Sequence, residues 1–114
     1  MVKMEAIVRE ENYEEIKDAL NALGVHGITV SQVMGCGVQK GHSEYVRGSE
    51  VEVNMVPKIK FEIVFTSQEW IEKTVQVIQE IACTGNHGDG KIFVYEIMDA
   101  IRIRTGERGP QAIY

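Results

Sequence analysis

The residue types best suited to chemistry gather at positions 84–91, which read Thr-Gly-Asn-His-Gly-Asp-Gly-Lys. Three glycines among six positions disfavour helix and strand, and they allow backbone angles that other residues avoid. Backbone N–H groups that curve around one point, with a lysine beside them, suit a phosphate group. Further on, Arg102 and Arg104 are two residues apart and would point to one side of an extended segment. We interpret the glycine run, Lys91 and both arginines as a polyphosphate nucleotide site; the alternative is a solvated turn with surface charges.

Composition limits the class of protein. A chain of 114 residues with a net charge of −5 predicts a single domain, residues 1–114, and gives no support for nucleic acid as a partner. The sequence contains no apolar run of about eighteen residues, the length that a membrane-spanning helix requires. Cys36 and Cys83 are far apart, which suits free thiols in a reducing cytoplasm. The scattered histidines argue against a zinc site.

The first part of the chain predicts a strand, a helix and a second strand. Residues 2–9 alternate as a strand does. Asn12 followed by Glu15 resembles a capping box, and Gly24 suits the end of the helix that follows. Residues 27–34 are rich in β-branched side chains and predict the second strand.

The second part of the chain predicts the same order of strand, helix and strand. Residues 58–65 alternate strictly and predict the third strand. Thr66 with Glu69 predicts a second capping box, and the helix that follows it should end before Gly85. Residues 92–98 predict a fourth strand with two buried faces, and residues 99–114 form a C-terminal tail.

The predicted order βαββαβ indicates an α+β, ferredoxin-like fold with two helices on one face of a four-stranded antiparallel sheet. The other face would be too apolar to remain in water, and we therefore expect a homo-oligomer whose sheets face inward. The side chains expected there are Ile7, Val64, Phe93, Tyr95 and Ile97.

Residues 37–56, between the second and third strands, have no regular period and are closed by Pro57. Loops of this length are usually functional or disordered, so we expect a mobile segment. Both a tolerated insertion and a partner-binding arm remain open. Gln39 and Lys58 lie at its two roots.

Three stretches together resemble the PII nitrogen-regulatory signal-transduction family: Gly35-Cys36-Gly37-Val38-Gln39-Lys40-Gly41-His42 with Arg47-Gly48, then residues 84–94, then Ile101-Arg102-Ile103-Arg104-Thr105-Gly106-Glu107. The resemblance covers essentially the whole chain. It implies a homotrimer of ferredoxin-like subunits with ATP or ADP in the clefts between subunits, and Mg²⁺ and 2-oxoglutarate beside ATP.

The resemblance also implies residue roles. Nucleotide-binding residues would be Gly27, Thr29, Gly35, Gly37, Val38, Glu62, Gly88, Asp89, Gly90, Lys91, Arg102 and Arg104. Gly27, Thr29 and Glu62 would lie near adenine and ribose, and the two arginines would come from the neighbouring subunit. Residues for 2-oxoglutarate would be Gln39, Lys40, Gly41 and Lys58, with Gln39 also helping to hold Mg²⁺.

In this family the long loop is the T-loop, which docks on targets such as an ammonium channel or other nitrogen-metabolism proteins. Arg47 matches the loop-tip arginine, and contact with a membrane would be indirect, through a channel partner. The chain departs from the family at Val38, where an arginine is frequent, and at Val51, where enteric members carry the uridylylated tyrosine. Ser49 matches a serine phosphorylated in cyanobacterial members, and Tyr45 does not inherit the tyrosine's role.

Two function classes remain. The first is a cytoplasmic sensor and adaptor without turnover, with at most weak ATPase activity. The second is a nucleotide-dependent phosphotransfer enzyme, for which His87 would be the histidine nearest the glycine run.

Overall fold

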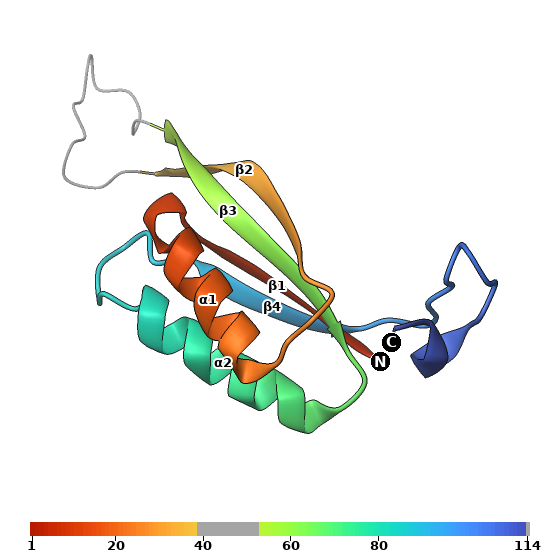
Figure 1. The fold of residues 1–114 in the computed structure, drawn as a ribbon. Coiled ribbons are helices and arrows are strands. Elements are labelled where there is room, and N and C mark those ends of the chain that lie inside the picture. The colour runs from red at the N-terminus through yellow and green to blue at the C-terminus, as the bar shows by residue number, and fades with distance from the viewer. Residues whose placement is uncertain (39–52, 114) are drawn as a thin grey trace, which may run out of the picture.

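The computed structural model describes residues 1–38 and 53–113. Its elements in chain order are β1 (Val2–Arg9), η1 (Glu10–Asn12), α1 (Tyr13–Leu23), β2 (Thr29–Val38), β3 (Val53–Phe65), α2 (Gln68–Ala82), β4 (Lys91–Glu96) and η3 (Gly109–Ala112). The strands form one sheet in the order β2-β3-β1-β4, and every neighbouring pair is antiparallel. Both α-helices cover the same face of this sheet (Figure 1). The predicted ferredoxin-like α+β fold is confirmed.

The core forms between that sheet face and the helices because the strands alternate as predicted. Met4, Ala6 and Val8 of β1 are buried, and so are alternate residues of β3 from Ile59 to Phe65. Ile16 and Leu20 of α1 pack against them, as do Ile71, Thr74, Ile78 and Ala82 of α2. Each element thus buries one face and leaves the other in contact with solvent, the pattern expected for a two-layer domain.

Asn12 is the N-cap residue of α1, as predicted, but neither predicted capping box is confirmed. A 3₁₀ turn, η1, leads directly into α1, so Asn12 is already in the right-handed helical region (φ −89°, ψ −2°) and makes no capping hydrogen bond with its side chain. The extended conformation required for capping is absent there. The second helix begins one residue later than expected, with Ser67 rather than Thr66 at its N-cap. Gly24 ends α1 with φ 93°, as predicted.

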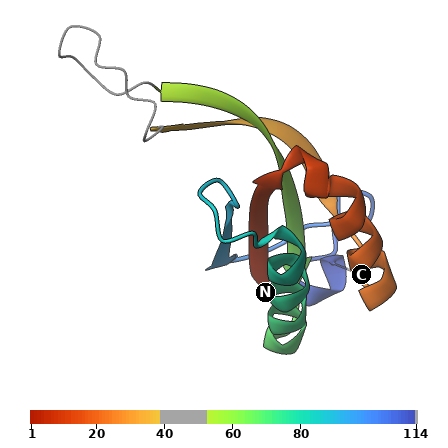
Figure 2. The ribbon, with the colours of Figure 1, turned by 90° about the vertical axis from the view of Figure 1, so that its left-hand side faces the viewer.

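The strand bounds also correct the predicted loop. β2 and β3 remain paired as far as Val38 and Val53, so positions 37–38 and 53–56 lie in strands instead of in the loop expected over 37–56. Pro57 lies inside β3, opposite Met34. A proline is tolerated there because β1 has already ended at Arg9, opposite Lys58, and β3 has only one neighbouring strand. Figure 2 shows this two-stranded ribbon projecting beyond the helices.

The sheet face without helices is less apolar than predicted. Lys3 pairs with Glu62 at 2.8 Å and Lys60 with Glu5 at 3.6 Å, and the Tyr95 hydroxyl donates to Glu5 at 2.9 Å. Strand register places Ile7, Val64 and Phe93 among these charged groups. We call this surface the open face.

The last strand differs from its prediction in two ways. β4 ends at Glu96, so Ile97 and Met98 fall outside it. Phe93, Val94 and Tyr95 are exposed by 49%, 47% and 42%, because β4 is an edge strand and its two faces are not both buried within one chain. None of the helices in residues 1–38 and 53–113 is long and apolar enough to cross a membrane.

Candidate functional site

The glycine run folds as a tight loop between α2 and β4. Gly85, Gly88 and Gly90 have φ of 85°, 98° and 109°. These values lie in the left-handed region that glycine enters without steric cost. The prediction that glycines are needed here for positive φ is confirmed.

Asp89 holds this loop from inside. Its Oδ2 accepts hydrogen bonds from the backbone N–H groups of Thr84 at 2.8 Å and Gly85 at 3.0 Å. Its Oδ1 accepts from the Thr84 hydroxyl at 2.5 Å and from Arg9 Nη1 at 2.5 Å. The Thr84 hydroxyl and N–H, followed by the Arg9 guanidinium, lower the pKa of Asp89 far below its ordinary range, so the carboxylate is ionised.

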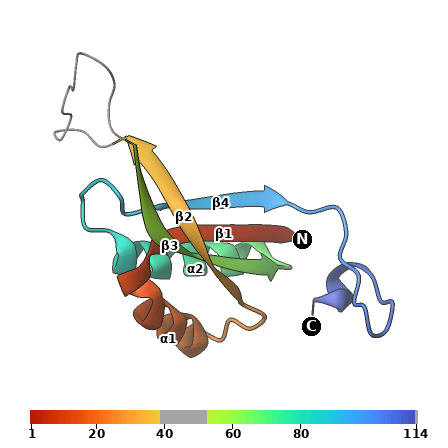
Figure 3. The ribbon, with the colours of Figure 1, turned by 90° about the horizontal axis from the view of Figure 1, so that it is seen from above.

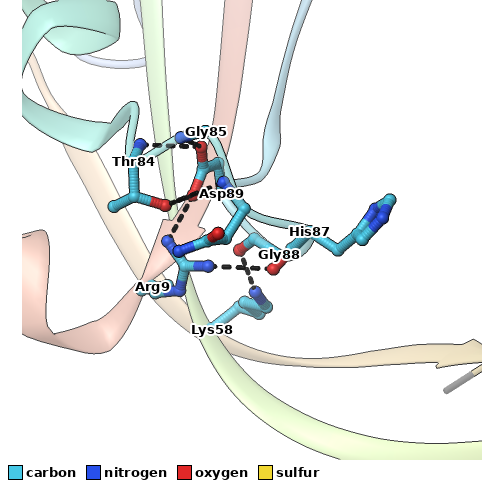
Figure 4. Close-up of polar contacts among 8 residues, drawn as sticks. Arg9, Lys58, Thr84, Gly85, His87, Gly88 and Asp89 are labelled. Carbon is cyan, nitrogen blue, oxygen red and sulfur yellow. Dashed lines mark hydrogen bonds and ion pairs between the residues drawn. The ribbon is translucent and has the colours of Figure 1, made fainter. Parts of the chain in front are cut away.

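Two cations from the sheet bind the outer turn of the loop (Figure 4). Arg9 Nη2 donates to the carbonyl oxygen of His87 at 3.0 Å, and Lys58 Nζ donates to that of Gly88 at 2.8 Å. Arg9 on β1 and Lys58 on β3 are direct register partners, which brings both side chains to one end of the open face. Lys58 was among the predicted site residues, whereas Arg9 and Thr84 were not.

The side chain of His87 stands apart from the polar contacts of the loop. The imidazole of His87 points away from the Arg9–Asp89 contacts, and only its backbone carbonyl takes part in them (Figure 4). Among the described residues no side chain orients the ring by a hydrogen bond, although a histidine nucleophile or base requires such a partner.

Further residues of the predicted site lie along β2 and β3. In the strand register, Thr29 lies opposite Glu62, and Gly35 lies opposite Val56. Glu62 and Lys58 lie four residues apart on one strand, which corresponds to roughly 13 Å at about 3.3 Å per residue. A hydrogen bond from Lys3 lowers the pKa of Glu62 and keeps it ionised. Lys3 was not predicted, because only the strand register reveals that it lies beside Glu62.

Gly27 lies two residues before β2 begins and lines a cavity of about 410 Å³. The other residues of this cavity are Gly24, Val25, His26, Val64, Phe65, Thr66, Trp70 and Ile113. Gly27, Thr29 and Glu62 therefore lie at one end of the predicted site, and the glycine loop lies toward its other end.

The two predicted arginines are not extended neighbours. Residues 103–105 form a turn, closed by the Gly106 N–H donating to the Arg102 carbonyl at 2.7 Å, so the extended segment from which a shared side was expected is not formed. Arg102 donates to Glu107 at 2.9 Å and to the Gln111 carbonyl at 3.2 Å, whereas Arg104 is exposed.

This C-terminal segment lies at the opposite end of β4 from the glycine loop (Figure 3). A single chain therefore does not bring Arg102 and Arg104 to the loop. Lys91, the first residue of β4, pairs with Ile7 and is exposed. Gln39, Lys40, Gly41 and Arg47 lie outside the described residues, as do Tyr45, Ser49 and Val51. Gly37 and Val38 lie in β2, opposite Asn54 and Val53.

Comparison with known proteins adds an independent observation. The model of the family "Nitrogen regulatory protein P-II" matches residues 1–107. A nitrogen regulatory protein P-II of Rhodospirillum rubrum is 50% identical over 113 residues, covering 99% of this chain and all of that protein. A P-II 1 protein of Methanothermobacter thermautotrophicus is also 50% identical, over 99% of this chain and 97% of its own length. The solved B. subtilis GlnK–ATP complex is similar in structure, with a TM-score of 0.81 and 44% identity, over 97% of this chain and 96% of that one.

Proposed function

Since the chain belongs to the nitrogen regulatory protein P-II family, we propose that it binds ATP or ADP together with 2-oxoglutarate, and that it controls nitrogen-metabolism proteins through the segment between β2 and β3. The single observation that carries the proposal is the glycine loop, whose left-handed glycines lie beside the cations Arg9 and Lys58. The similarity to a structure described as a GlnK–ATP complex supports the same ligand.

The nucleotide would lie along the open face beside β2 and β3. Its phosphates would occupy the glycine-loop end, near Gly88, Gly90 and Lys91, where left-handed glycines and a cation suit an anion. Its ribose and base would lie toward Thr29 and Glu62, because the Glu62 carboxylate is an acceptor for hydroxyl groups.

The site would be completed by a neighbouring subunit. Arg102 and Arg104 are separated from the glycine loop by the length of β4 in one chain (Figure 3). A homotrimer with its sheets inside would bring these arginines from the adjacent subunit and would cover Phe93 and Ile7 of the open face. The exposure of Phe93 supports this arrangement.

The residues beside the loop also fit a dicarboxylic acid. Lys58 pairs with a backbone carbonyl, and no described carboxylate neutralises it, so its positive charge is available for a carboxylate of 2-oxoglutarate. No cluster of acidic, histidine or cysteine side chains suited to a metal occurs among the described residues. Gln39, together with ATP phosphate oxygens, would hold Mg²⁺, which would supply positive charge to neutralise the phosphates.

Calorimetry tests this proposal directly. ATP and ADP should each bind in competition, and 2-oxoglutarate should bind only when Mg²⁺ and ATP are present. Failure of the protein to bind either nucleotide would overturn the proposal. A steady-state assay separates the enzyme alternative, because turnover above roughly 1 s⁻¹ would indicate catalysis as the role.

The regulatory part of the proposal needs its own measurement. We expect trypsin to cleave at Arg47 at different rates with ATP, with ADP, and with Mg²⁺, ATP and 2-oxoglutarate together, because ligand binding at Gln39 and Lys58 should restrict the segment between them. Equal rates in all three conditions would mean that this segment does not report the ligand state.

A further inference from the structure

The Asp89 carboxylate is the feature of the loop that nucleotide binding alone does not explain. We propose that Asp89 is a positioning residue: with Thr84 and Arg9 it holds the loop in its anion-binding shape, and Arg9 shields bound phosphates from the charge of Asp89. This inference rests on the proposed nucleotide-binding function.

The contacts of Asp89 join both ends of the loop. Its two oxygens accept from Thr84 and Gly85, which lie just after the end of α2, while Asp89 itself is separated from the first residue of β4 by Gly90 alone. Four hydrogen-bonding contacts, including the one with Arg9, use the main acceptor positions of a carboxylate. The carboxylate is therefore engaged within the loop, and a bound phosphate would meet the backbone of Asp89 instead.

The cations of the sheet set the direction of the backbone N–H groups. The carbonyls of His87 and Gly88 point toward Arg9 and Lys58. In a planar trans peptide the N–H group points opposite to the carbonyl, so the N–H groups of Gly88 and Asp89 point away from these cations. No described residue accepts a hydrogen bond from either group. Two neighbouring free donors in a left-handed turn are a typical anion-binding concavity.

Charge compensation explains the presence of Arg9. An ionised carboxylate next to a polyphosphate would repel it, and the repulsion is large where water is excluded. The ion pair with Arg9 Nη1 at 2.5 Å offsets that charge, and the same guanidinium binds the loop through His87. Asp89, Thr84 and Arg9 thus act as one unit, so their effects on nucleotide affinity should not be additive.

The first test measures ATP and ADP affinity by calorimetry on the full-length protein. Asp89→Asn replaces one acceptor oxygen with an NH₂ group that cannot accept from Thr84 or Arg9, and we expect both nucleotides to bind at least about tenfold more weakly. The single variant Arg9→Met and the double variant Asp89→Asn/Arg9→Met complete the comparison. The fold-loss of nucleotide affinity in the double variant should be smaller than the product of the fold-losses in the two single variants. Glu69→Gln, which removes a carboxylate from a surface ion pair with Lys73 at 3.3 Å, should leave both affinities unchanged.

A second pair of variants keeps the inference testable if Asp89→Asn fails to fold. Thr84→Val removes the hydroxyl that donates to Asp89 and accepts from the Asn86 N–H at 3.2 Å. It should weaken ATP binding about fivefold, the factor that corresponds to about 1 kcal/mol. Thr84→Ser retains the hydroxyl and should restore wild-type affinity. Wild-type affinity in both Asp89→Asn and Thr84→Val would overturn the positioning role while leaving nucleotide binding intact. A wild-type protein that binds no nucleotide would instead overturn the function on which the inference rests.

Discussion

Gly90 and Ile7 approach so closely that no side chain fits between them: a methyl group on Gly90 would lie 1.9 Å from the carbonyl oxygen of Ile7. Gly90 is also in the left-handed region, with φ 109°. This contact brings the end of the glycine loop against β1, two residues from Arg9, and therefore sets the distance between the loop and the cations on the sheet.

Gly90→Ala should disturb the loop more than any other single methyl group added to it. We expect a loss of more than about 2 kcal/mol in the free energy of unfolding, because overpacking and backbone strain act together. Gly85→Ala is the matched control: φ is 85° there, nothing lies within 4 Å, and strain alone should cost about 1 kcal/mol. Urea denaturation measures both, and equal losses would show that the contact with Ile7 does not constrain the loop.

Lys91→Ala should weaken ATP binding at least about tenfold, because a charge-assisted contact to phosphate contributes about 1.5–3 kcal/mol. Lys17→Ala is a suitable control, since Lys17 is a partly exposed lysine on α1 that pairs with Glu14 at 3.0 Å. Calorimetry of the two variants separates a local contact from a general effect of lost positive charge. An unchanged affinity in Lys91→Ala would place the phosphates away from this end of β4.

Assembly should depend on the open face. Light scattering of the wild-type protein should give a mass three times that of the 12.8-kDa chain. Phe93→Glu places a second carboxylate opposite Glu5, and burying both within an interface should shift the protein to the monomer mass. Val94→Glu is the control, because Val94 is similarly exposed but its register partner, Met4, lies on the helix-covered face. The Val94→Glu protein should remain trimeric. A monomeric wild-type protein, or dissociation of both variants alike, would contradict assembly through the open face.

The contribution of Asp89 to stability should disappear in acid. Its pKa is lowered in the folded protein, so the stabilisation is fully present above the unfolded-state pKa, about 3.9, and is lost as the pH falls from there toward the folded-state pKa. Wild type should therefore be more stable than Asp89→Asn at pH 7, and this difference should shrink below about pH 4. Chemical denaturation at pH 7 and below about pH 4 measures this difference in the free energy of unfolding. A difference that is the same at both pH values would mean that it does not come from the carboxylate charge.

Local sequence patterns were enough to predict the elements and their order. Ile59, Phe61, Ile63 and Phe65 alternate, and all four are buried. The spacing of glycines at 85, 88 and 90 predicted a loop with left-handed residues, because few other residues adopt that conformation. Side-chain period and backbone sterics are properties of neighbouring residues, so they can be predicted without the fold.

Contacts between distant positions were decided only by the tertiary structure. Arg9 meets Asp89 across 80 positions, and Lys3 meets Glu62 on an adjacent strand, because the antiparallel register places these side chains together. The sequence predicted Asp89 as part of a phosphate cradle, whereas the fold turns its carboxylate toward Thr84 and Arg9. Register is set by the packing of the whole sheet against two helices. The residues that hold the glycine loop in place were therefore hidden in the sequence, although the loop itself was visible.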